Sequence, residues 1–154
     1  MLNASPFENA ADIDLSIVIV SFNTKNLLLH CLESVQTNTT GLVSEIFVVD
    51  NASSDGSADA VSERFPKVQL IRNWKNRGLS AADNQAFRQS RGRYLVHQSS
   101  DTILLGNSFL KIVRFLDENH EFSVLSPKII DESDQPYPMR LRQDCPKDAF
   151  LKIL

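Results

Sequence analysis

The chain has 154 residues, of which 42% are hydrophobic and 23% charged, and these proportions are ordinary for one soluble globular domain. Its net charge of −3 and its scattered basic residues lack the electrostatic pattern of a protein that binds nucleic acid or an anionic membrane. No apolar run approaches the ~18 residues that would span a bilayer.

The N-terminal residues and the cysteines indicate the cellular compartment. The stretch MLNASPFENAADID is polar and acidic, and it lacks the basic start and apolar block of a secretory signal. We therefore expect a cytoplasmic protein in which Cys31 and Cys145 are free thiols, because their spacing suggests neither a zinc site nor a disulfide framework. Residues 1–13 are predicted to form a flexible leader.

Strands and helices are predicted to alternate from residue 15 onward. Apolar, β-branched runs are typical of strands buried on both faces of a parallel sheet, and they occur at 15–22 and 45–50. Further strands are predicted at 68–72, 94–98 and 122–126. Apolar residues at helical spacing predict helices at 26–36, 57–65, 79–90 and 107–119. Asn23 or Thr24 is expected to cap the first helix. This alternation with short connections is typical of an α/β layered fold with a mainly parallel sheet.

Small polar side chains and carboxylates follow three of these strands. Ser21 and Asn23 end the first strand. Asp50 ends the second, and Asp101 follows the fourth. The carboxyl ends of parallel strands form the edge at which open α/β sheets bind ligands. A nucleotide suits such an edge, because one carboxylate can accept a hydrogen bond from a base N–H while a second holds a divalent cation against a diphosphate.

Several other nucleotide and metal motifs are missing from the sequence. It contains neither G-x-G-x-x-G nor G-x-x-x-x-G-K-[ST], so the dinucleotide and P-loop interpretations lack their glycines. The G-x-S-x-G elbow is also missing. Residues 51–62 partly match a calcium loop, but that loop would begin with Asn51, and Ser62 stands where its bidentate Glu is needed.

Each candidate residue also has a purely structural interpretation. Asp50 and Asp101 can cap the helices that follow them, and Ser53 and Asp55 are typical helix-capping residues. Phe22 is equally suited to a hydrophobic core. The remaining polar candidates, which we expect to be packed or solvated, are His97, Arg88, Arg91 and Arg93.

Three ordered segments resemble one known family. They read SIVIVSFNTKNLLLHCLESV, EIFVVDNASSDGSADAV and NRGLSAADNQAFRQSRGRYLVHQSSDT. They are similar to the nucleotide-binding half of family 2 glycosyltransferases with the GT-A fold, above all to the rhamnosyltransferase-like branch with its motifs VDNASxDGS, NxGFAxANNxG and NPDT. The resemblance covers residues 15–131. It implies a truncated Rossmann-like α/β/α fold, with a GT-A donor domain at 14–131 and the start of an incomplete acceptor-side region at 132–154.

The resemblance implies roles for the residues that match the family's motifs. Ser21, Phe22 and Asn23 would line the nucleobase and ribose pocket. Asp50 would accept a hydrogen bond from the base N–H. Asp101 would be the metal-binding carboxylate, with Mg²⁺ or Mn²⁺ stabilising the departing diphosphate as a Lewis acid. The other nucleotide-binding residues that the resemblance implies are Asn51, Ser53, Gly78, Asp83, Asn84 and Ser99.

The chain departs from the family pattern at three places. Ser99 and Ser100 replace the Asn-Pro of the branch, and Ser99 also replaces the first D-x-D carboxylate of other members. Asp83 stands where many members have Arg or Asn, which adds negative charge near the diphosphate. The sequence ends at Leu154, before the later half in which the family carries its general base, so no catalytic residue is assigned.

The activity that the resemblance implies is inverting transfer of a sugar from a nucleoside-diphosphate donor to a hydroxyl group on a glycan, a lipid or a small acceptor. The alternative is a non-catalytic or truncated nucleotide-sugar-binding module, which lacks the acceptor site and general base and works with a partner chain or as a dimer. Ser99 and the end of the sequence at Leu154 favour this alternative. A third interpretation is a flavodoxin-like domain with an unrelated ligand, which would make the three ordered motifs a coincidence.

Overall fold

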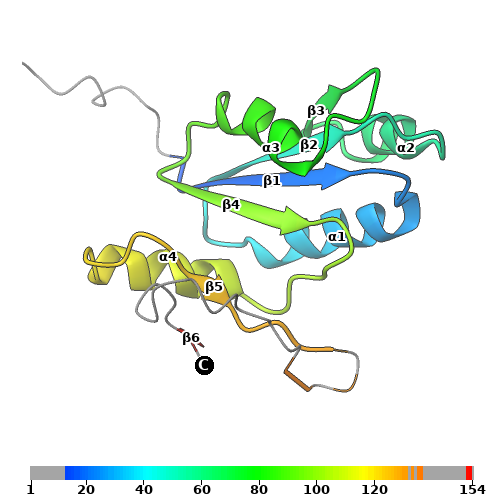
Figure 1. Ribbon diagram of the computed structural model, residues 1–154. Coiled ribbons are helices and arrows are strands. Elements are labelled where there is room, and N and C mark those ends of the chain that lie inside the picture. Colours follow the sequence, from blue (N-terminus) through cyan, green and yellow to red (C-terminus); the bar gives the residue numbers. More distant parts are fainter. Residues whose placement is uncertain (1–12, 132, 134, 137–151, 154) are drawn as a thin grey trace, which may run out of the picture. The chain divides into compact units, whose positions relative to one another are not determined.

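Figure 1 shows the computed structural model of the chain. The structure describes residues 13–131, 133, 135, 136, 152 and 153. The chain divides into two compact units, Met1–Asn107 and Ser108–Leu154. Most of the expected leader, Cys145 and most of the expected acceptor-side region lie outside the described residues.

The described part of the first unit contains a four-stranded parallel sheet in the order β3-β2-β1-β4. Its strands are β1 (Leu15–Ser21), β2 (Ser44–Asp50), β3 (Gln69–Arg72) and β4 (Tyr94–Ser99). The connecting helices are α1 (Lys25–Asn38), α2 (Ser57–Arg64) and α3 (Leu79–Phe87). Parallel strands need a crossover to return the chain to the same end of the sheet, and each of these helices forms part of such a crossover.

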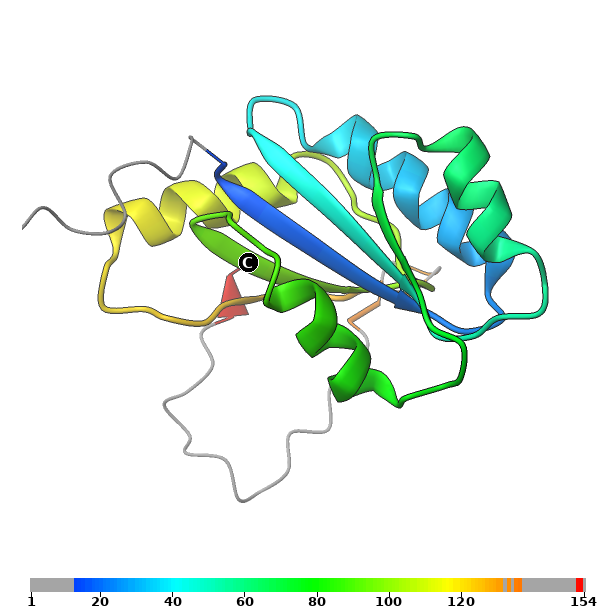
Figure 2. The ribbon, with the colours of Figure 1, turned by 90° about the horizontal axis from the view of Figure 1, so that it is seen from above.

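The sheet lies between two layers of helix. Viewed from above, α1 and α2 lie on one side of the sheet and α3 lies on the other (Figure 2). On the α3 side, Val18, Phe47 and Val49 form a buried cluster with Ala82 and Ala86. Each fully buried valine or phenylalanine side chain stabilises the fold by roughly 1.5–3 kcal/mol. The α/β/α fold class predicted from the sequence is confirmed.

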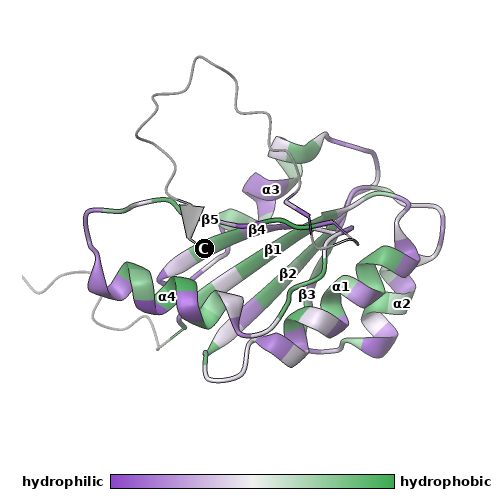
Figure 3. Ribbon diagram, turned by 90° about the horizontal axis from the view of Figure 1, so that it is seen from below, coloured by the Kyte–Doolittle hydropathy of each residue, from purple (hydrophilic) through white to green (hydrophobic). Residues whose placement is uncertain are grey.

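The α1 side of the sheet is equally apolar. Figure 3 shows hydrophobic residues along the central strands, whereas α1 and α2 combine hydrophobic and hydrophilic positions. Leu28, Leu32 and Val35 of α1 are completely buried, as their helical spacing predicts. Strand β1 has a neighbour on each edge and a helical layer over each face, which makes it the centre of the core.

The described part of the second unit contains one helix and a short pair of strands. These elements are α4 (Ser108–Glu118), β5 (Ser126–Pro127) and β6 (Lys152–Ile153), with β5 parallel to β6. The strand predicted at 122–126 is wrong except for its last residue, because residues 122–125 are irregular. The ring of Phe122 packs against Phe115 of α4, with 5.5 Å between the ring centroids, so Phe122 covers a helix instead of joining a strand.

The helix boundaries differ from the prediction at α3, which ends at Phe87 instead of residue 90. The backbone N–H and the hydroxyl of Ser90 both donate to the carbonyl of Ala86, each at 3.0 Å. The chain thus closes in a turn beyond Phe87, in which one carbonyl accepts from both groups of Ser90. Among the described residues, no helix has both the length and the apolar composition needed to cross a membrane.

A buried carboxylate network closes the amino end of the sheet. Glu45 of β2 accepts hydrogen bonds from Ser16 Oγ and from the backbone N–H of Arg91, both at 2.6 Å. Gln69 Nε2 donates to the same carboxylate at 3.1 Å. Burial raises the pKa of Glu45, but these hydrogen bonds and the charge of Arg91 outweigh it and hold the pKa below its ordinary value. The backbone N–H of Gly92 donates to Ser16 Oγ at 2.8 Å and ties the start of β4 into the network.

Candidate functional site

The carboxyl ends of β1, β2 and β4 lie side by side. In the parallel register Ser21 pairs with Asp50, and Val20 pairs with Ser99. The polar residues predicted at these strand ends therefore meet at one edge of the sheet, toward which the arrows of β1 and β4 point in Figure 1. Because β2 and β4 flank β1, Asp50 and Asp101 lie at the same edge on either side of β1.

The turn after β1 is joined to the loop after β2 through Asn23. Its φ of 54° is left-handed, a conformation that asparagine tolerates better than most residues. The backbone N–H of Asn23 donates to Ser53 Oγ at 3.0 Å, and its side-chain oxygen accepts from the backbone N–H of Ser54 at 2.8 Å. The preceding residue, Phe22, is 47% exposed, so its interpretation as a core residue is wrong.

The side-chain cap predicted at the start of α1 is also wrong. Thr24 occupies the N-cap position, but its hydroxyl makes no capping hydrogen bond. Thr24 Oγ1 lies instead 2.9 Å from Ser21 Oγ and 3.1 Å from Ser100 Oγ, which links the ends of β1 and β4. The cap comes from the loop after β2, where Asp55 Oδ2 accepts from the backbone N–H of Lys25 at 2.8 Å.

Asp50 is only 4% exposed at the end of β2. Its Oδ2 accepts from the backbone N–H of Ser53 at 3.1 Å, and its Oδ1 accepts from Ser57 Oγ at 3.2 Å. A carboxylate has about four acceptor positions, so about two remain for a ligand. Asp50 does not cap α2, because Gly56 holds the N-cap position and Asp55 Oδ1 accepts the N–H of Ser57 at 3.0 Å.

The start of α3 carries three more of the predicted residues. Gly78 holds the N-cap position with a left-handed φ of 79°, and its carbonyl lies 3.4 Å from Nδ2 of the buried Asn51. Asn84 is exposed on α3. Asp83 is buried, and its Oδ1 lies 2.9 Å from Nδ1 of His97 on β4. Sequence reasoning missed this pair, because the two residues are 14 positions apart and belong to different elements.

Asp101 is exposed in the turn after β4. Ser99 Oγ donates to Asp101 Oδ1 at 2.5 Å, and Thr102 Oγ1 donates to the carbonyl of Ser99 at 2.8 Å. In the part of the chain that the structure describes, no three His, Cys, Asp or Glu side chains gather into a metal cluster. The oxygen donors that this turn offers a cation are therefore one carboxylate and neighbouring hydroxyl groups.

Cys31 is expected to be unreactive in the native chain. Burial raises the pKa of its thiol from 9.0 to about 11, a hydrogen bond with Gln98 lowers it, and the charge of Asp101 raises it further. At pH 8 only about one thiol in a thousand is then ionised, and the thiolate is the nucleophile. Because the folded pKa exceeds the unfolded value, the stability that this neutral thiol provides is lost as the pH rises from 9 toward 11.

Alkylation by iodoacetamide, followed by mass spectrometry of the Cys31 peptide, measures this reactivity. The reaction should be slow in the native chain, rapid in urea, and faster in Asp101→Asn than in the wild type. Equal native and unfolded rates would contradict the burial of Cys31.

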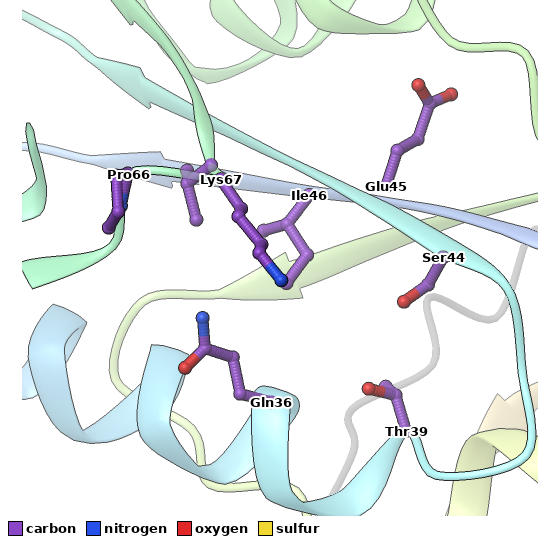
Figure 4. Close-up of a pocket in the computed structure, with 8 residues that line it drawn as sticks. Gln36, Thr39, Ser44, Glu45, Ile46, Pro66 and Lys67 are labelled. Atoms are coloured by element: carbon purple, nitrogen blue, oxygen red, sulfur yellow. The ribbon is translucent and has the colours of Figure 1, made fainter.

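Two hollows in the first unit differ in their relation to the strand ends. One, of about 370 Å³, lies at the start of α1 and is lined by Asn23, Thr24, Lys25, Asn26, Leu27 and Asp55. The other, of about 530 Å³, lies at the amino end of β2 and is lined by Gln36, Thr39, Ser44, Glu45, Ile46, Pro66, Lys67 and Val68. In Figure 4 the carboxylate of Glu45 points away from this second hollow. The first hollow includes Asn23, and neither includes Asp50 or Asp101.

Several curated proteins are similar to this chain in sequence. EpsH of Bacillus subtilis (strain 168), which is named as a glycosyltransferase, is 29% identical over 152 residues, covering 91% of this chain and 42% of that protein. The poly(ribitol-phosphate) beta-glucosyltransferase of Bacillus spizizenii is 30% identical over 110 residues, covering 68% of this chain and 17% of that enzyme. The chain thus spans less than half the length of these relatives.

Solved structures and a family model lead to the same group of proteins. S. aureus TarS in complex with UDP gives a TM-score of 0.69 at 23% identity, over 82% of this chain and 38% of that one. The mannosyltransferase PcManGT from Pyrobaculum calidifontis, in complex with GDP-Man and Mn²⁺, gives 0.67 at 23% identity, over 78% and 36%. The fold of the chain is the GT-A fold. Residues 16–152 match the model described as Glycosyl transferase family 2, and the chain therefore belongs to that family.

Proposed function

We propose that this chain binds a nucleoside-diphosphate sugar at the carboxyl edge of its sheet, as the donor-binding part of an inverting glycosyltransferase. The acceptor would be a hydroxyl group on a glycan, a lipid or a small molecule. The observation that carries the proposal is the register of three adjacent strands, which pairs Ser21 with Asp50 and sets Ser99 beside Val20 at the same edge of the sheet. Membership of glycosyl transferase family 2 and neighbours solved with UDP or GDP-Man support it.

The nucleoside would bind over the ends of β1 and β2. Asp50 keeps acceptor positions for a base N–H, and its two existing hydrogen bonds fix the carboxylate in place. Phe22 offers an exposed ring on which a base can stack. Ser21, Asn23 and Ser53 would complete this side, since the hydrogen bond from Asn23 to Ser53 holds the turn after β1 against the loop after β2 and Ser21 is bonded to Thr24 within that turn.

The diphosphate would lie toward β4 and the start of α3. Asp101 and Ser99 would hold Mg²⁺ or Mn²⁺, because a hard cation accepts one protein carboxylate and takes its other oxygen ligands from phosphate and water. Such a cation stabilises negative charge on a departing diphosphate as a Lewis acid. Gly78 and Asn84 would flank the phosphates. Asp83 would lie beside them, with its side chain held by the contact with His97.

Finer assignments complete the proposal. The sequences VDNASSDGS and NRGLSAADNQA support a place in the rhamnosyltransferase-like branch of the family. We assign residues 14–131 to the donor domain and 132–154 to the start of an acceptor-side region, and we place the protein in the cytoplasm.

Calorimetric titration of the purified chain with UDP, GDP and dTDP, with and without Mn²⁺, tests the proposal. At least one diphosphate should bind saturably at one site, and Mn²⁺ should tighten its binding at least tenfold, because a cation held by Asp101 would offset the negative charge of the phosphates. The matching nucleoside monophosphate is the control and should show a much smaller metal effect. No saturable binding of any diphosphate would contradict the proposal.

Incubation with the corresponding nucleotide sugars then separates the enzyme from the binding module. Release of the nucleoside diphosphate, or transfer to an added acceptor, supports an enzyme. Binding without turnover supports the non-catalytic module, for which the single carboxylate at Asp101 is the favouring observation.

A further inference from the structure

The side chain of Asn51 uses every hydrogen-bonding position that it has. Its Oδ1 accepts from the backbone N–H of Arg77 at 3.0 Å and from Asn73 Nδ2 at 3.2 Å. Its Nδ2 donates to Asn76 Oδ1 at 2.9 Å and to the carbonyl of Gly78 at 3.4 Å. An asparagine amide has two acceptor positions and two donor hydrogens, so none remains for a ligand.

All four partners belong to the connection between β3 and α3, residues 73–78 (Figure 1). The backbone groups of Arg77 and Gly78 fix which end of the amide is oxygen and which is nitrogen, because an N–H can only donate and a carbonyl can only accept. Asn51 itself is 3% exposed and follows directly after Asp50. Its position is thus fixed by the core, while its side chain holds a surface loop.

Further hydrogen bonds extend this clamp to α3. Asn73 and Gln85 exchange two hydrogen bonds through their amides, at 2.8 and 3.0 Å. Asn76 Oδ1 also accepts from the backbone N–H of Gly78 at 2.9 Å, which shapes the turn into the helix. The loop is therefore tied at its start, middle and end, although its tip is open: Trp74 is 84% exposed.

The geometry points to Asn51 as a positioning residue that holds the 73–78 loop against the carboxyl edge of the sheet without touching the nucleotide. This inference rests on the proposed function for its consequence, because the loop brings Gly78 to the phosphate side of that site. A loop that is already ordered need not lose its conformational freedom when a ligand binds, so the clamp raises affinity without a direct contact.

The experiment compares Asn51→Asp with Asn76→Asp in the full chain. Both substitutions add one negative charge to the same network and keep the side-chain shape. Asn51→Asp loses both donated hydrogen bonds and places an oxygen against the carbonyl of Gly78. Asn76→Asp keeps the two hydrogen bonds of Asn76 in this network, because Asn76 accepts both of them through Oδ1, one from Asn51 Nδ2 and one from the backbone N–H of Gly78. ¹⁵N relaxation of the loop amides measures order, and the indole of Trp74, the single tryptophan of the chain, is an unambiguous marker.

We expect the heteronuclear NOEs of the amides from Trp74 to Gly78 to fall in Asn51→Asp and to stay at the wild-type level in Asn76→Asp. Affinity for UDP or GDP, whichever the wild type binds, should fall at least tenfold in Asn51→Asp and less than threefold in Asn76→Asp. Asn51→Ala should resemble Asn51→Asp, which separates geometry from charge. Asn38→Ala removes two hydrogen bonds at the end of α1 and should leave the loop unchanged.

Weaker binding in Asn51→Ala with an ordered loop would mean that Asn51 contacts the ligand, and would overturn the inference. Equal loop disorder in Asn51→Asp and Asn76→Asp would overturn it too, because charge alone would then be the cause. Unchanged loop amides and unchanged affinity would also overturn it. If the Asn51 variants do not fold, Asn73→Ala tests the clamp from within the loop, because it removes the hydrogen bond that Asn73 donates to Asn51 Oδ1. A wild type that binds no nucleotide refutes the proposed function, while the relaxation data still judge the clamp.

Discussion

Asp101→Asn is expected to remove the effect of Mn²⁺ on nucleoside diphosphate binding, while the weaker metal-independent binding remains. The substitution keeps the shape of the side chain and removes the one carboxylate that the turn after β4 offers to a cation. Hard divalent cations bind carboxylates far better than amides, so we expect at least a tenfold loss of affinity in the presence of Mn²⁺. Calorimetric titration with and without Mn²⁺ measures the effect directly.

Asp50→Asn is the matched control for this experiment, because the same chemical change is made at the other flanking strand. It should weaken binding by roughly 10–100-fold whether or not Mn²⁺ is present, because a hydrogen bond to a charged group contributes about 1.5–3 kcal/mol. Thermal melts should show both variants folded. If both substitutions leave the affinity unchanged, or if Asp50→Asn abolishes only the metal effect, the assignment of the two carboxylates is wrong.

Gly92→Ala is expected to be among the most destabilising substitutions in the chain. A Cβ at this position would lie 2.5 Å from the backbone nitrogen of Ser16 and 2.7 Å from the carbonyl carbon of Leu15. Strand β1 cannot move aside, because β2 and β4 pair with its two edges. We expect the free energy of unfolding to fall by about 3 kcal/mol, the upper end of the range for overpacking, because the Gly92–Ser16 hydrogen bond is disturbed as well.

Urea denaturation measures this loss, and Gly106→Ala is its control. A Cβ at Gly106 meets nothing within 4 Å, and its φ of 53° leaves only backbone strain of about 1 kcal/mol. A chain of this size should lose roughly 6–12 °C of melting temperature in Gly92→Ala and about a third of that in the control. Equal losses in the two variants would mean that the close approach of β4 to β1 does not limit stability.

The positions of the strands and helices in the first unit follow from local sequence. The run from Ile46 to Val49 is apolar at every position, so only a strand covered on both faces buries all of it. Leu28, Leu32 and Val35 recur at the helical period and are buried on one face of α1. Local periodicity fails in the second unit, where the ring contact between Phe122 and Phe115 takes an apolar residue out of the predicted strand.

The sequence also indicated which residue types end the strands, since carboxylates and small polar residues after buried runs are visible without coordinates. It did not say that β2 and β4 both lie next to β1. That order alone aligns Ser21 with Asp50 and sets Ser99 beside Val20. Strand order depends on how the crossovers pack, which no window of residues encodes.

By itself, the sequence determined the alternating α/β architecture, the burial of β1 and β2 and the chemistry available at the strand ends. Only the tertiary structure decided what each polar side chain does with that chemistry. Asn51 is bound to a loop 22 to 27 residues further along the chain, and Asp83 is held by His97 on another element. Asparagine and aspartate can bind a ligand or a backbone equally well, so their roles depend on which groups the fold brings within about 3 Å.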